Sequence, residues 1–121
     1  MIAFSVELER GPVTMLNLLK FLPDGGAERY AEYGAAVAPL LDGVGGRVIH
    51  AGQPATALIG PADWDLVLLV QYPNNGAFME MVNSPEYGAI AHLRTEALQR
   101  SELHPMYEGD AEKTSESPTE D

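Results

Sequence analysis

Hydrophobic runs and chain-breaking residues divide the first half of the chain into a strand, a helix and a second strand. The segment VTMLNLLKF at 13–21 lies between Gly-Pro and Pro-Asp-Gly-Gly, which predicts a strand. Its alternate positions are largely apolar on both sides, so we expect both faces to be covered. Large apolar residues at 27–41 recur every three or four positions, which predicts an amphipathic helix that Pro39 kinks or ends. The segment RVIHAG at 47–52 favours a second strand.

The second half of the chain begins with the strongest strand pattern, DLVLLVQY at 65–72. A short helix is expected around 77–82. Ser84 and Pro85 predict the start of another helix, because Ser is a favoured N-cap and Pro a favoured first helical residue. We expect this helix to reach residue 98 or 100 and a short strand to follow at 103–107, where Pro105 suits an edge position.

The predicted order of elements is β-α-β-β-α-α-β. Connection rules favour one arrangement for it, an α+β fold with a four-stranded antiparallel sheet and helices on one face, the ferredoxin-like split βαβ. A single chain leaves the other face of such a sheet without a cover. Because the first and third strands are apolar on both faces, we expect a second copy to bury that face, which gives a homodimeric α/β barrel.

The composition limits the partners and the compartment. Among 121 residues, 18 are acidic and 7 basic, which argues against a nucleic-acid or anionic-membrane partner. There is no cysteine, and therefore no disulfide or thiolate nucleophile. The longest apolar run, at 66–70, is far shorter than the roughly 20 residues that span a bilayer. The first residues lack the basic and apolar regions of a secretory signal, so a cytoplasmic location is expected.

The acidic excess is unevenly distributed along the chain. Residues 108–121 carry six acids and one base and have no aromatic or aliphatic residue larger than Ala. Such a segment cannot bury enough apolar surface to fold, so we expect a disordered acidic tail after a single globular domain at 1–107. Nearly half of the net charge of −11 belongs to this tail.

Several strings in the chain occur in the order of a known family. They are MLNLLKF at 15–21, GGRVIHAG at 45–52, WDLVLLVQYP at 64–73 and AFMEMVNSPEY at 77–87, with Tyr30, Tyr33 and Arg94. In combination they resemble the domain-of-unknown-function family 1330 of the dimeric α/β-barrel superfamily, over about residues 12–107. The resemblance implies a ferredoxin-like protomer and a homodimer but no established activity. Related superfamily members include cofactor-independent monooxygenases, lactone isomerases and haem enzymes, so the fold alone does not select an activity.

Three polar residues are candidate catalytic groups. His50 lies in a predicted strand and is a potential general base, although a structural hydrogen bond is the commoner role of such a residue. Asn17 interrupts an apolar strand and needs polar partners, either on a ligand or on a neighbouring segment. Arg94 falls on an apolar helix stripe, where it would bind a substrate carboxylate or, as the favoured alternative, pair with an acid such as Asp65 or Glu86.

Four aromatic residues are candidate contacts for a substrate: Tyr33, Trp64, Tyr72 and Tyr87. Aromatic side chains with polar ends are typical of small-ligand pockets, although the helical spacing of Tyr30 and Tyr33 is more often core packing. The three histidines lack metal-site spacing and the glycines lack the dinucleotide-binding pattern, so we expect no metal and no cofactor.

Two functions remain open at this stage. One is a cofactor-independent enzyme for a small organic substrate, with His50 as general base and Asn17 or Arg94 stabilising an oxyanion. The other is a non-catalytic module that binds a small molecule or self-associates. The catalytic version requires His50 and Asn17 in one cavity and fails if they point to opposite sides of the sheet.

Overall fold

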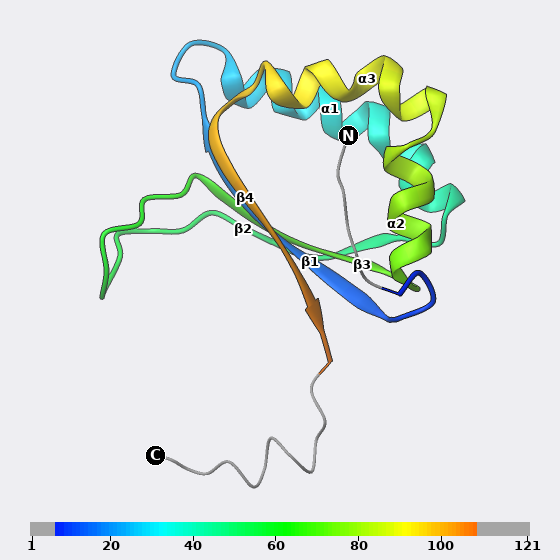
Figure 1. The fold of residues 1–121 in the computed structure, drawn as a ribbon. Coiled ribbons are helices and arrows are strands. Elements are labelled where there is room, and N and C mark those ends of the chain that lie inside the picture. Colours follow the sequence, from blue (N-terminus) through cyan, green and yellow to red (C-terminus); the bar gives the residue numbers. More distant parts are fainter. Residues whose placement is uncertain (1–6, 109–121) are drawn as a thin grey trace, which may run out of the picture.

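The computed structural model of the chain describes residues 7–108. In chain order the elements are β1 (Val13–Phe21), α1 (Gly26–Gly43), β2 (Arg47–Gly52), β3 (Leu66–Tyr72), α2 (Asn75–Val82), α3 (Pro85–Thr95) and β4 (Leu98–Tyr107). The strands form one antiparallel sheet in the order β2-β3-β1-β4, and the helices gather on one side of it (Figure 1). This confirms the predicted α+β, ferredoxin-like arrangement. We call the face toward the helices the inner face and the opposite face the outer face.

The central strand β1 divides its side chains between the two faces. Val13, Met15, Asn17 and Leu19 are buried on the inner face, and the residues between them are half-buried. Because side chains alternate along a strand, Leu16 and Leu18 belong to the outer face. Their partners on β3 are Leu69 and Val67, which extend the apolar outer face to a second strand.

The predicted boundary between the last helix and the last strand is wrong. α3 ends at Thr95, and β4 begins at Leu98 instead of residue 103. Ala97 is fully buried between them, and its carbonyl oxygen accepts a hydrogen bond from the Leu22 backbone at 2.9 Å. Leu98 then pairs with Phe21, so β4 accompanies β1 along its whole length.

Pro39 does not end α1, which continues to Gly43. Proline removes one backbone hydrogen bond and crowds the preceding turn. Leu40 and Leu41, which follow it, pack against the buried core, and this packing compensates for the lost bond.

Two further expectations concern the acidic tail and the presence of membrane-spanning segments. Apart from residue 108, the predicted acidic tail lies outside the described residues. Within residues 7–108, none of the helices combines the length and the hydrophobicity of a membrane-crossing segment.

Candidate functional site

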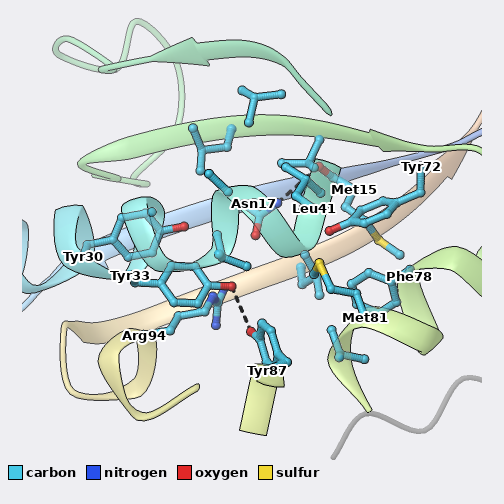
Figure 2. A pocket seen from close by; sticks show the side chains of 18 residues that line it. Met15, Asn17, Tyr30, Tyr33, Leu41, Tyr72, Phe78, Met81, Tyr87 and Arg94 are labelled. Carbon is cyan, nitrogen blue, oxygen red and sulfur yellow. Dashed lines mark hydrogen bonds between the residues drawn. The ribbon is translucent and has the colours of Figure 1, made fainter. Parts of the chain in front are cut away.

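A pocket of about 190 Å³ lies between the inner face of the sheet and the three helices. Its lining side chains come from all three helices and from all four strands, and most of them are apolar (Figure 2). Side chains from segments far apart in the sequence therefore meet here, as they do in small-molecule sites.

α1 supplies one wall of the pocket through residues three or four positions apart. Tyr30, Tyr33, Gly34, Val37 and Leu41 all line it, since this spacing places them on one helical face. Tyr30 and Tyr33 are each only 8% exposed. A β-carbon placed on Gly34 would meet no atom within 4 Å, so the glycine leaves open space on this face.

The floor of the pocket is the inner face of the sheet, and Asn17 is its polar centre. Asn17 pairs with Leu68 of β3 and with Leu103 of β4, which both line the pocket. Its side chain is 7% exposed, points into the pocket (Figure 2), and donates from Nδ2 to the Met15 carbonyl oxygen at 3.3 Å. The amide oxygen Oδ1 accepts no hydrogen bond within the described part of the chain.

Two tyrosine hydroxyls join α1 to α3 across the pocket. Tyr33 and Tyr87 share a hydrogen bond of 2.8 Å, and their rings meet edge to face at 88° (Figure 2). Burial raises the pKa of Tyr33 well above its usual range, and the adjacent Tyr87 adds to that shift. Burial raises the pKa of Tyr72 as well. Tyr33 and Tyr72 are therefore neutral hydroxyls at physiological pH, able to form hydrogen bonds but carrying no charge.

Arg94, in the last turn of α3, brings a positive charge to the same pocket. Burial raises the pKa of Tyr30, and the neighbouring Arg94 guanidinium opposes that rise. Arg94 is half-buried and forms no ion pair with any acid among residues 7–108. The favoured prediction of a structural ion pair is therefore wrong. Asp65 instead accepts from the Phe21 backbone at 2.9 Å.

His50 lies on the other face of the sheet. Val48 pairs with Val70 and lines the pocket, but the next β3 residue, Leu69, pairs with His50. The bulge at Ile49 thus inserts one residue and turns His50 to the outer face. The structure places His50 and Asn17 on opposite faces, so the condition for joint catalysis by them is not met within one chain.

Trp64 is also remote from the pocket. It lies in the loop before β3, and the Arg100 guanidinium carbon lies 4.3 Å from its ring centroid. Arg100 in turn pairs with Asp63, and Lys20 pairs with Asp63 at 3.3 Å. These contacts tie the loop to β1 and β4, which is a structural role for the tryptophan.

The pocket therefore contains most of the candidate site residues and several that the sequence reasoning did not single out. The candidates that line it are Asn17, Tyr33, Tyr72, Tyr87 and Arg94. Met15, Gly34, Phe78 and Met81 also line it but were not candidates. Met15 lies on the same face of β1 as Asn17, so the alternation of side chains along the strand could have predicted that it lines the pocket. No cluster of three or more His, Cys, Asp or Glu suited to a metal ion occurs within residues 7–108.

Known proteins similar to this chain confirm the family and the fold. The family model for Domain of unknown function (DUF1330) matches residues 25–103. A crystal structure of a protein of unknown function from Rhodopseudomonas palustris is 37% identical in sequence. It superposes with a TM-score of 0.77, over 83% of this chain and 84% of that chain. None of the curated proteins compared with this chain matches it.

More distant structures share the fold alone. A dimeric protein of unknown function with a ferredoxin-like fold from Bacteroides fragilis is 14% identical, with a TM-score of 0.57 over 79% of this chain and 95% of that chain. A dimeric ferredoxin-like protein of unknown function from Jannaschia sp. is 12% identical, with a TM-score of 0.65 over 79% of this chain and 98% of that chain.

Proposed function

The chain belongs to the family described as Domain of unknown function (DUF1330), whose description assigns no activity, and we propose from its pocket that it is a homodimeric protein that binds a small organic molecule. The ligand occupies the space between the inner face of the sheet and the helices. The observation that carries this proposal is the pocket itself, with its apolar walls and its few polar groups directed inward.

The size of the pocket suits a ring-sized molecule. An apolar cavity of roughly 150 Å³ in another protein holds benzene. The pocket here measures about 190 Å³, which leaves room for a ring and a small polar substituent. Gly34 supports this interpretation, since a glycine inside a helix costs up to about 1 kcal/mol relative to Ala and nothing here would collide with a β-carbon.

Binding is favoured over catalysis by the chemistry of the walls. No His, Asp, Glu, Lys, Ser or Thr occurs among the described side chains that line the pocket. Its buried phenols have raised pKa values and are poor bases near neutral pH. With His50 on the outer face, the pocket is equipped to hold a ligand but has no group suited to remove a proton from it.

The homodimeric part of the proposal is supported by the outer face. Leu16, Leu18, Val67 and Leu69 form an apolar block across the two central strands. Within the described residues the helices all lie on the other side of the sheet (Figure 1). An apolar face of this kind is typical of an interface, and two structures with the same fold are dimeric proteins.

The proposal is tested by filling the pocket at Gly34. A library of small aromatic and aliphatic molecules is screened by melting temperature against the full chain and against Gly34→Leu. The control is Gly88→Leu, since Gly88 is an exposed glycine of α3 where a β-carbon also meets nothing within 4 Å.

We expect wild type and Gly88→Leu to be stabilised by the same compounds and Gly34→Leu to have lost that response. Both substitutions replace a helical glycine by a good helix former, so neither should lower the melting temperature of the free protein. Equal binding to Gly34→Leu and wild type, or no stabilising compound at all, contradicts the proposal.

A further inference from the structure

The pocket has an unbalanced charge that indicates the class of its ligand. We propose that the ligand is a small organic carboxylate whose anionic group binds to Arg94, an inference that rests on the proposed ligand-binding function. Among the described side chains that line the pocket, Arg94 is the one that is ionised at neutral pH. The protein has 18 acidic residues, yet none among residues 7–108 pairs with this guanidinium.

A half-buried guanidinium without a counter-ion is unusual, because partial removal from water is costly unless an anion or hydrogen-bond acceptors replace it. The position of Arg94 in the last turn of α3 compensates part of its charge, since the carbonyl end of a helix carries about half a negative charge. Arg94 also hydrogen-bonds to the Tyr30 hydroxyl, which is a single neutral oxygen. Neither this hydroxyl nor the α3 carbonyls supply the flat, negatively charged pair of oxygens that a guanidinium binds best. A carboxylate supplies both the charge and that geometry.

The tyrosine pair provides a second contact for the same anionic group. Tyr33 and Tyr87 have two hydroxyl protons between them and use one in their mutual hydrogen bond. The other proton is available to an acceptor. Figure 2 shows the Tyr33 hydroxyl and the Arg94 guanidinium on the same side of the pocket, so one carboxylate group can face both residues.

The floor of the pocket requires a donor elsewhere on the ligand. Asn17 is 7% exposed, and its Oδ1 atom has no donor within the described part of the chain. A buried oxygen of this kind is destabilising unless it accepts a hydrogen bond. A hydroxyl or N–H group on the ligand satisfies it.

The remaining walls accept an apolar body. Met15, Val37, Leu41, Val70 and Met81 offer no polar side-chain group apart from the weakly accepting methionine sulfur. Together with the volume of about 190 Å³, they select a single ring or a branched chain of similar size. Hydroxy-substituted aromatic monocarboxylates combine all these features, so 3-hydroxybenzoate is a suitable probe.

The experiment compares ligands that differ in charge and nearly match in shape. Dissociation constants of benzoate, 3-hydroxybenzoate, benzamide and benzylamine are measured by calorimetry on the full chain at neutral pH. Arg94→Gln removes the charge and keeps a long polar side chain. Arg29→Gln, a change of the same kind at a half-buried α1 residue outside the pocket, is the control.

We expect wild type to bind benzoate about tenfold or more tightly than benzamide, and 3-hydroxybenzoate more tightly again. Arg94→Gln should weaken benzoate binding by about tenfold or more and leave benzamide almost unchanged, whereas Arg29→Gln should behave as wild type. Arg94→Lys, which keeps the charge but not the planar fork, should lie between the two. This variant also tests the inference if Arg94→Gln fails to fold.

The outcomes separate this inference from the proposal on which it rests. If benzamide or benzylamine binds as tightly as benzoate and Gly34→Leu abolishes that binding, the pocket is a ligand site but the carboxylate assignment is wrong. Unchanged benzoate binding in Arg94→Gln overturns the assignment in the same way. If no probe and no library compound binds the wild type, both proposals fail.

Discussion

At the scale of single residues, the Tyr33–Tyr87 hydrogen bond is a side-chain contact that joins α1 to α3 across the pocket. Its length is 2.8 Å, and both hydroxyls line the ligand space. Replacing either tyrosine by Phe keeps the ring packing and removes one partner of the bond. The effect therefore isolates the hydroxyl from the apolar contribution of the ring.

We predict that Tyr33→Phe and Tyr87→Phe each lower the free energy of unfolding by about 1 kcal/mol, measured by urea denaturation. The double variant should lose about 1 kcal/mol less than the sum of the two, because the second substitution removes a group that is already unpartnered. Additive losses would show that the two hydroxyls do not stabilise each other.

Burial of the tyrosines also predicts a dependence of stability on alkaline pH. The pKa values of Tyr30, Tyr33 and Tyr72 are raised above their ordinary value of 10.0, mainly by burial. Above that pH the unfolded chain releases these protons and the folded protein retains them. The stability is therefore complete below about pH 10 and is lost as the pH rises further.

In a spectroscopic titration from about pH 8 to pH 12, the phenolate absorbance of these three buried tyrosines should rise together with loss of the circular dichroism signal. Tyr72→Phe should reduce the amplitude of that rise. If all five tyrosines ionise while the protein is still folded, the burial argument is contradicted.

The residue scale also shows which parts of the site could be predicted from the sequence. Asn17 and Arg94 were identifiable because each places a polar group in an apolar pattern, and both line the pocket. His50 was not placed correctly because strand alternation from Val48 assigns it to the inner face, whereas the β2 bulge reverses that assignment. The unpaired state of Arg94 depends on the positions of distant acids, and local sequence carries no signal for it.

At the scale of elements, the boundaries that depend on residues close in sequence were predicted correctly. The boundary that depends on contacts between distant segments was not. β1 was predicted to the residue because Gly-Pro and Pro-Asp-Gly-Gly interrupt the chain on both sides. The start of α3 was predicted from Ser84 and Pro85. The end of α3 was missed because Ala97 and Leu98 also fit a helical stripe. Pairing of β4 with β1 decides their conformation, and that contact is remote in sequence.

The N-cap of α3 is the local contact whose loss should be easiest to measure. Ser84 Oγ accepts a hydrogen bond from the Tyr87 backbone at 3.1 Å and donates one to the Met81 carbonyl oxygen at 2.8 Å. It thereby links the end of α2 to the first turn of α3. Because α3 carries Tyr87 and Arg94, the cap also orients two walls of the pocket.

We predict that Ser84→Ala lowers the free energy of unfolding by about 1 kcal/mol and that Ser84→Asp, which also accepts the N-cap bond, loses less. Ser101→Ala, at an exposed position of β4, is the matched control and should change stability little. Thermal and urea unfolding measure both effects. Equal stability of Ser84→Ala and Ser101→Ala would show that the cap is not stabilising.

At the scale of the whole molecule, the sheet couples the pocket to the proposed dimer interface. Met15 and Asn17 of β1 line the pocket, and Leu16 and Leu18 between them lie on the outer face. β3 repeats the pattern, with Leu68 on the inner face and Leu69 on the outer. A second copy packed on the outer face would hold in place the same strands that form the floor of the pocket.

This arrangement predicts that the wild-type protein sediments as a dimer and that Leu16→Lys shifts it to the monomer. Leu16 pairs with Leu69 on one side and His104 on the other, so a lysine there would place a charge inside the apolar block, which is costly without a partner. Ile59→Lys, at a loop residue that is 97% exposed, is the control and should remain dimeric. Analytical ultracentrifugation over a range of concentrations distinguishes the species. If the wild type is monomeric throughout that range, the proposed dimer does not form. If the Leu16→Lys variant remains dimeric, the interface lies elsewhere. The outer leucines would then have to be explained by a different partner.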